Sequence, residues 1–192
     1  MQPACIDLPV TKGTVRQPLL LMQPLFAYPP IAGILEEAPL RLSVPAHGLP
    51  SDWPVWPEKV IGWSALNLDR TREAGRLARV IDADTIEFNE LTANGERITG
   101  GRLAYRLPID LIGCRAELVI SPAGLSPITF STTAGGLAIT GPGRLLLEIA
   151  ADQSAGFAWE SAPYALRITW SDGSEQEYLR GRVLNGGCCH GR

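Results

Sequence analysis

Apolar and polar residues alternate along this chain in short runs separated by turn-forming residues. Alternation with a period of two is typical of half-buried β-strands, whereas an amphipathic helix places apolar residues three and four positions apart. No segment of about 12 residues or more keeps the helical period. The pattern predicts strands over residues 19–22, 40–44, 59–63, 79–82, 85–89, 102–106, 115–121, 128–132, 137–140, 144–150, 164–170 and 177–184. The expected fold class is therefore all-β.

Tight turns join several of these strands into hairpins. Asp172-Gly173 separates two alternating runs, and glycine supplies the positive φ that a short antiparallel connection requires. Residues 82–84 and 141–143 break the pattern in the same way. The only helix expected is a single turn within residues 151–157, capped by Asp152. The hairpins predict antiparallel sheets.

Composition agrees with many short elements, because 20 glycines and 16 prolines occur in 192 residues. The net charge is −3 and no basic run is present, so a nucleic-acid partner is not expected. The longest apolar stretch near the start, residues 19–22, is too short to cross a bilayer, and the first residues lack the pattern of a secretory signal. We expect no membrane partner and a cytoplasmic site of synthesis.

Four cysteines occur without any Cys-x-x-Cys spacing, which argues against a disulfide framework. Cys188, Cys189 and His190 lie together near the end of the sequence. Adjacent cysteines chelate one ion poorly, and a tetrahedral site would need ligands from elsewhere. Residues 187–192 are therefore expected to be a frayed tail, and no metal site is predicted.

Candidates for catalysis are few, because His47 and His190 are the only histidines. His47 precedes Gly48 in a predicted turn, where a ring nitrogen commonly bonds the local backbone. Acidic residues alternate along a predicted hairpin and lack the spacing of a calcium loop, which predicts a solvated face. These residues are Asp82, Asp84, Glu87 and Glu90.

Glycine pairs at 100–101 and 135–136 lie between strands rather than before helices, so turns are expected and not phosphate-binding loops. No nucleophile or acid–base group has an orienting partner in the sequence pattern. The chain is accordingly predicted to be no enzyme and to need no cofactor.

Three tryptophans, Trp53, Trp56 and Trp63, cluster with Pro54 and Pro57. Exposed aromatic surfaces can bind peptides or sugars. Large aromatic side chains also commonly fill the core of a small domain. Both interpretations of the tryptophans stay open at the level of sequence.

One stretch of the chain has a His-Gly-Leu turn, a strand carrying valine, a Leu-Asn turn and a valine-rich hairpin that ends in Thr-Ile-Glu-Phe. These features lie in residues 46–55, 60–63, 66–67 and 79–88. The stretch resembles a small β-domain found in many phage tail proteins, which is named for its similarity to the first catalytic cysteine half-domain of ubiquitin-activating enzymes. Trp53-Pro54 stands where that family usually has a glycine. The resemblance carries no ubiquitin-activating activity, because no matching catalytic cysteine motif is present.

The rest of the chain resembles a second phage module. The matching stretches are residues 11–15, 19–22, 108–120, 164–170 and 179–183. They are similar to the N-terminal domain of phage baseplate upper proteins. Together, the two resemblances imply a discontinuous antiparallel β-sandwich over residues 1–37 and 106–186, with a barrel-like module, residues 38–105, inserted. The simpler alternative is two consecutive domains split near Tyr105.

The resemblances imply a structural component of a tailed bacteriophage virion, made in the host cytoplasm. A tail or baseplate adaptor is expected, in contact with other virion proteins and with copies of itself in a symmetric, multi-copy assembly. A head–tail connector, a capsid-surface protein, and a carbohydrate- or receptor-binding module using the three tryptophans are the alternatives. Residues 1–9 and 186–192 are expected to become ordered only against neighbouring subunits.

Overall fold

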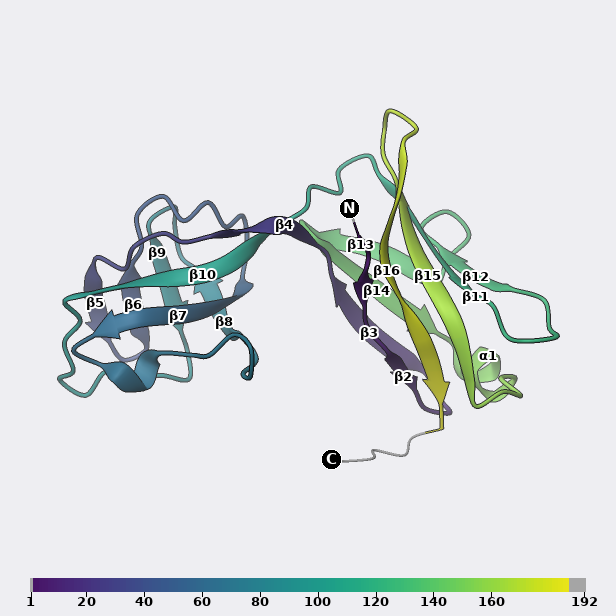
Figure 1. The fold of residues 1–192 in the computed structure, drawn as a ribbon, viewed down its shortest axis with the longest axis horizontal. Helices are drawn as coiled ribbons and strands as arrows, with labels where there is room; N and C mark the ends of the chain where they lie inside the picture. The colour runs from purple at the N-terminus through teal and green to yellow at the C-terminus, as the bar shows by residue number, and fades with distance from the viewer. Residues whose placement is uncertain (1, 187–192) are drawn as a thin grey trace. The chain divides into compact units, whose positions relative to one another are not determined.

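The computed structural model describes residues 2–186, which form an almost entirely β structure (Figure 1). Within this range there are sixteen strands, one 3₁₀ turn, η1 (Ser64–Leu66), and one short helix, α1 (Ala151–Ala155). The prediction of an all-β fold is confirmed.

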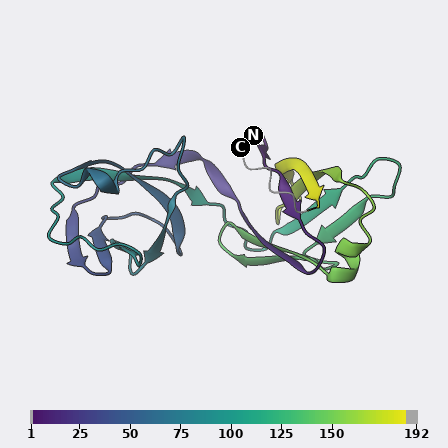
Figure 2. The same cartoon turned by 90° about the horizontal axis from the view of Figure 1, so that it is seen from below.

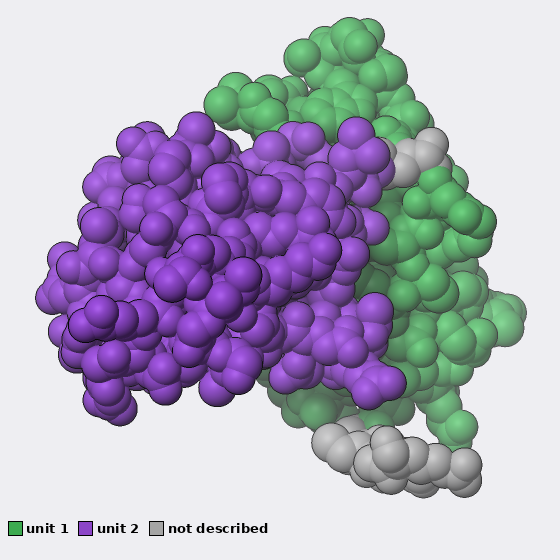
Figure 3. Space-filling model, turned by 60° about the vertical axis from the view of Figure 1, so that its left-hand side comes forward, with its two compact units in different colours: residues 1–21, 109–192 green, residues 22–108 purple. Residues whose placement is uncertain are grey.

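The chain divides into two compact units (Figure 3). Unit 2 runs from Met22 to Pro108, and unit 1 comprises the residues before and after it. The inserted unit thus begins 16 residues earlier than residue 38, the expected boundary, and ends at Pro108 instead of residue 105. In unit 1 the Ile109 N–H donates to the Leu21 carbonyl oxygen at 3.2 Å. The two ends that flank the insertion therefore lie side by side, the condition under which an inserted domain is tolerated.

Unit 1 is a β-sandwich (Figures 1 and 2). The strands of its larger sheet are β1 (Ala4–Cys5), β2 (Leu8–Val10), β11 (Arg115–Ile120), β12 (Ile128–Ser131), β15 (Ser161–Thr169) and β16 (Glu175–Asn185). The smaller sheet has the order β13 (Leu137–Gly141), β14 (Arg144–Ile149) and β3 (Val15–Leu20). Alternation determines the packing: in β11, Ala116, Leu118 and Ile120 are buried, whereas Arg115 and Glu117 are exposed.

The start of the chain departs from a wholly antiparallel sandwich, because β1 and β2 pair with β16 in parallel. Leu8 is fully buried, and Asp7 accepts a hydrogen bond from the Arg182 N–H at 2.9 Å. A Cβ on Gly181 would collide with the Ile6 carbonyl oxygen, so glycine is required where this segment crosses β16. The expectation that residues 1–9 order only against other subunits is wrong for the strands in that range, which cover an edge of β16 that would otherwise be unpaired.

The predicted local turns are present. Gly173 has φ of 82° in the turn between β15 and β16, and residues 82–84 and 141–143 likewise connect paired strands. Helix α1 is a single turn as expected, but its N-cap is Ala150 and not Asp152. The Gln153 side chain accepts the Ala150 N–H at 3.0 Å, which satisfies a backbone donor at this end.

Unit 2 is a curled, barrel-like sheet with strand order β4-β10-β7-β8-β9-β6-β5 (Figure 1). The strands are β4 (Met22–Ala27), β5 (Gly33–Glu37), β6 (Leu40–Ser43), β7 (Trp53–Ile61), β8 (Arg76–Val80), β9 (Thr85–Phe88) and β10 (Gly100–Pro108). Its core contains Leu40, Leu42, Val55, Ile86 and Leu103, all without exposed surface.

Residues 22–37 belong to unit 2 because this segment supplies the outermost strand at each end of the curled sheet, β4 and β5. Its first part runs along β10, where the Leu103 N–H donates to Pro29 O and the Ile31 N–H to Gly101 O, both at 3.0 Å. Its second part pairs with β6 as β5. Without the segment, β10 and β6 would each have an unpaired edge. Assigning residues 22–37 to the sandwich was therefore wrong.

Two further local predictions are corrected. Strand β7 begins at Trp53 and not at residue 59. Its first residues alternate as a strand requires, with Trp53 and Val55 facing the core and Pro54 on the partly exposed face. The glycine pair 100–101 is part of β10 and lies at an irregularity in its pairing with β7, so it is no turn.

Glu87, predicted on a solvated face, is only 1% exposed. It lies on β9 directly opposite Arg41 of β6 and Arg79 of β8. Its carboxylate accepts Arg41 Nε at 2.6 Å and Arg79 Nη1 at 3.1 Å, while Arg41 Nη1 also contacts Glu36 at 2.6 Å. A row of alternating charges thus crosses four neighbouring strands, and the two guanidiniums cover Glu87.

We expect Glu87→Gln to reduce the acid sensitivity of unit 2. The Arg41 hydrogen bond lowers the Glu87 pKa from its ordinary 4.5, so the ionised carboxylate stabilises the folded state above that pH. This stabilisation is lost as the pH falls through the folded-state pKa. Urea unfolding measured from neutral pH to below the ordinary Glu pKa of 4.5 should show a smaller decrease in the free energy of unfolding for Glu87→Gln than for the unsubstituted chain. Glu90→Gln, at an exposed position, is the control. The prediction is contradicted if the free energy of unfolding depends on pH in the same way in Glu87→Gln and in the unsubstituted chain.

Candidate interaction surface

The three tryptophans of unit 2 do not form one surface. Trp53 has no exposed surface, and its Nε1 donates to the Arg106 carbonyl oxygen at 2.7 Å. Trp63 is half-buried and packs against the core of unit 2. Trp56 lies on the other face of β7, where it is half-buried and its Nε1 donates to Glu73 O at 2.9 Å. Trp56 is therefore the only one of the three on the outer side of the sheet.

The outer face around Trp56 is built by register across three adjacent strands. Trp56 of β7 lies opposite Ala104 of β10, and Glu58 lies opposite Arg102. On the other edge of β10, Arg106 lies opposite Phe26 of β4. Because alternate side chains of a strand share a face, Arg102 and Arg106 project on the same side as Trp56.

Arginine side chains lie over two aromatic rings on this face. The Phe26 and Tyr28 rings are stacked, with centroids 6.0 Å apart. Arg106 lies 4.7 Å and Arg70 4.6 Å from the Phe26 centroid; Arg102 lies 4.2 Å and Arg70 5.6 Å from that of Tyr28. Contacts of this kind occur about once per 70–80 residues, so four on two rings are a concentration. We call Phe26, Tyr28, Glu58, Arg70, Arg102 and Arg106 the arginine–aromatic face.

The charge on the arginine–aromatic face is predominantly positive. Glu58 supplies its one carboxylate, which accepts Arg102 Nη2 at 2.8 Å and lies 3.4 Å from Arg70 Nε. The Arg70 guanidinium also donates to the Tyr28 hydroxyl at 2.7 Å, and this hydrogen bond raises the Arg70 pKa above its ordinary value. Glu58 and the Tyr28 ring thus hold the guanidiniums of Arg70 and Arg102 in place. The Arg106 guanidinium is positioned by the Phe26 ring.

Sequence reasoning missed this face because its members come from distant parts of the chain. Phe26 and Tyr28 belong to the segment that was assigned to the sandwich, and Arg70 lies in the loop after η1. No local spacing relates these residues. The nearest signal is the alternation of Arg102 and Arg106 along β10.

His47 has the structural role predicted for it. It is 3% exposed, Nδ1 accepts the Leu49 N–H at 3.0 Å, and Nε2 lies 2.8 Å from Asp82 O. Nε2 is therefore the protonated nitrogen and donates to Asp82. The His47 carbonyl accepts the Tyr105 hydroxyl, whose pKa burial raises to about 12. Both ring nitrogens are engaged, so His47 is not available as a base or ligand.

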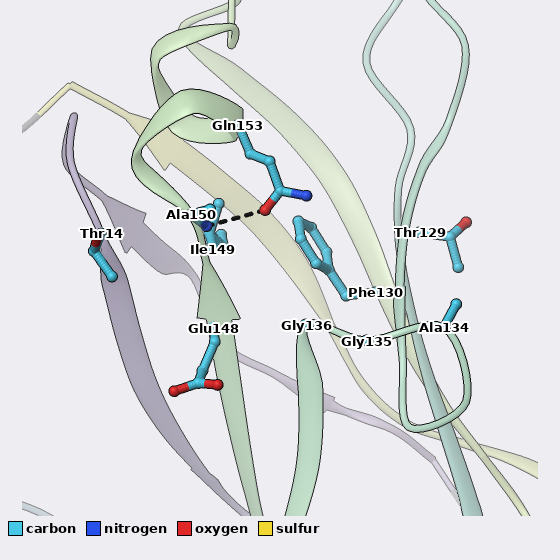
Figure 4. A pocket seen from close by; sticks show the side chains of 10 residues that line it. All are labelled: Thr14, Thr129, Phe130, Ala134, Gly135, Gly136, Glu148, Ile149, Ala150 and Gln153. Carbon is cyan, nitrogen blue, oxygen red and sulfur yellow. Dashed lines mark hydrogen bonds between the residues drawn. The ribbon is translucent and has the colours of Figure 1, made fainter.

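Unit 1 contains an open hollow of about 450 Å³ (Figure 4). It is lined by residues of β12, β14, α1 and the adjoining loops, among them Thr129, Gly136, Glu148 and Gln153. Glu148 is paired with Arg16 at 2.7 Å, and Gln153 bonds the Ala150 N–H. The carboxylate and the amide that line the hollow are therefore both engaged by other residues of unit 1.

Within residues 2–186, no group of three or more His, Cys, Asp or Glu side chains could hold a metal ion. No helix of the described part has the length and apolar character needed to span a membrane. Cys188, Cys189 and His190, and the predicted tail over residues 187–192, lie outside the described residues. No protein-family model, curated protein or solved structure matches the chain.

Proposed function

We propose that this protein is a structural component of a tailed bacteriophage virion, an adaptor of the tail or baseplate that joins subunits without catalysing a reaction. The two sequence resemblances to phage modules name this class of protein. The observation that carries the proposal is the insertion of one β unit into another, with residues before Met22 pairing with strands of the C-terminal half. Such a chain presents two separate β surfaces to different neighbours.

Surface chemistry also supports an assembly role. Unit 2 has the arginine–aromatic face, and tyrosine, tryptophan and arginine are the side chains that most often dominate protein interfaces. In a symmetric particle each contact is repeated, so modest interfaces add up to a stable assembly. The partners proposed are other virion proteins and further copies of this chain, reached after synthesis in the host cytoplasm.

A carbohydrate-binding module built on the three tryptophans is less well supported. Such a module needs the rings exposed together, but Trp53 is a core residue and Trp63 packs on the core. The arginine–aromatic face would suit a head–tail connector or a capsid-surface protein as well as a tail adaptor. The number of copies in the particle distinguishes these three roles.

We expect quantitative mass spectrometry of purified phage particles to detect the protein. For a tail or baseplate adaptor the copy number should be on the order of six to twelve, in multiples of three, as cyclic symmetry gives. Roughly hundreds of copies would instead place it in the capsid or tail tube. Complete absence from particles that contain their other tail proteins would overturn the proposal.

A further inference from the structure

The arginine–aromatic face presents guanidinium edges instead of bare ring faces. Arg70 and Arg106 both lie over the Phe26 ring, and Arg70 and Arg102 over that of Tyr28. A sugar or a nucleobase would stack on an open ring face, and here guanidiniums occupy that position. The groups left for a partner are N–H donors held at fixed positions.

These donors are not fully neutralised within the protein. Glu58 engages Arg102 through Nε at 3.1 Å and Nη2 at 2.8 Å, and it is also the carboxylate nearest to Arg70. Arg106 forms no ion pair with any described residue. Its planar fork of donors matches the geometry of a carboxylate, which it can bind through two parallel hydrogen bonds.

The neighbouring strand gives the shape of the partner. β4 is the end strand of the sheet order and pairs with β10 alone among the described strands. A free strand edge can pair with an extended polypeptide through main-chain hydrogen bonds, which a polysaccharide cannot supply. On β4 these bonds exclude the position of Pro24, which has no N–H.

We propose that the arginine–aromatic face binds an extended acidic protein segment, with carboxylates at alternate positions, from a neighbouring subunit. The proposal rests on the adaptor function above. Alternate side chains of an extended segment lie about 7 Å apart on one face. Arg70 and Arg106 contact one Phe26 ring at 4.6 and 4.7 Å, so their guanidiniums are close enough for two such carboxylates. Arg106 binds the first carboxylate, and Arg70 binds the second.

The test uses the purified full chain and a fluorescein-labelled peptide of repeating Glu-Thr units. Anisotropy measured at low ionic strength, where screening is weak, should show saturable binding, and the matching Gln-Thr peptide should not bind. Arg106→Glu is expected to weaken binding about ten- to a hundredfold, the loss expected for a charge-assisted hydrogen bond. Arg106→Lys, which keeps the charge but loses the fork, should give an intermediate loss.

Arg97→Glu is the matched control, because Arg97 is exposed elsewhere in unit 2 and the change in charge is identical. It should leave the affinity within about twofold of the unsubstituted chain. Circular dichroism verifies that each variant is folded. The proposal is overturned by absence of binding to the Glu-Thr peptide, or by equal weakening in the Arg97 and Arg106 variants. Tighter binding of a heparin oligosaccharide or of oligo(dT) than of the peptide would overturn it as well.

This result is independent of the virion test. Peptide binding by a chain that is absent from particles would remove the adaptor function and leave the face a carboxylate-binding surface. A chain present in particles that binds no acidic peptide would remove this inference alone.

Discussion

Residues 22–108, expressed without the rest of the chain, are expected to fold cooperatively, whereas residues 38–105 are expected not to fold. The longer fragment contains β4 and β5, which complete both ends of the curled sheet. The shorter one loses them, together with the buried Ile31 and the core contacts of Met22 and Ile34. Each apolar side chain of this size contributes roughly 1.5–3 kcal/mol when fully buried. Domains are stable by only about 5–15 kcal/mol, so this loss removes most of the margin.

Urea unfolding followed by circular dichroism, with proton–nitrogen NMR spectra of both fragments, measures the difference. The control is unit 1 with Leu21 joined to Ile109 by a short Gly-Ser linker. It should stay folded, because the Ile109 N–H already bonds the Leu21 carbonyl. Cooperative unfolding of the 38–105 fragment, equal to that of 22–108, would show that residues 22–37 are dispensable for unit 2.

The parts of the fold that sequence predicted are those specified by local chemistry. The hairpin of β15 and β16 was found because alternating apolar residues flank Asp172-Gly173, and glycine accepts the φ of 82° that the turn needs. The strand β11 was found for the same reason: its side chains alternate between buried and more exposed positions, and Val119 is half-buried. In both cases the signal lies within about fifteen consecutive residues.

The strands that sequence missed are stabilised by distant partners. β4 contains Pro24 and an exposed Leu25, so its local pattern is that of a loop. It is a strand because β10, some eighty positions further along the chain, supplies hydrogen bonds on one edge, with Ala27 opposite Tyr105. β1 and β2 depend in the same way on β16. Pairings over such separations leave no period in a single sequence.

The candidate surface, too, combines residues that the sequence could indicate with contacts that depend on distant strand pairing. Trp56, which lies beside the arginine–aromatic face, could be named from the sequence as one of three clustered tryptophans. The guanidiniums over Phe26 could not, because the pairing of Arg106 with Phe26 and the approach of Arg70 exist only after the sheet has formed. Likewise Glu87 alternates with the apolar Ile86 and Phe88, which predicts an exposed side chain, but it is buried because arginines from two adjacent strands cover it.

Trp53→Ala is expected to destabilise unit 2 by about 3–5 kcal/mol, the usual cost of truncating a large buried aromatic residue. Trp53 has no exposed surface, and the substitution also leaves the Arg106 carbonyl without the indole N–H that bonds it at 2.7 Å. Trp56→Ala should cost less, about 1 kcal/mol, because the Trp56 ring is only partly buried on the outer face, although the change also removes its hydrogen bond to Glu73 O. The two residues are three positions apart on one strand, so strand propensity is nearly the same for both.

Hydrogen exchange followed by mass spectrometry measures this contrast in the full chain, because peptides from residues 22–108 report on unit 2 separately from unit 1. Exchange in unit 2 should accelerate strongly in Trp53→Ala and slightly in Trp56→Ala, with unit 1 peptides as the internal reference. Equal acceleration in the two variants would mean that Trp56 is a core residue too. The outer face would then have no tryptophan, and its recognition chemistry would belong to Phe26, Tyr28 and the three arginines alone.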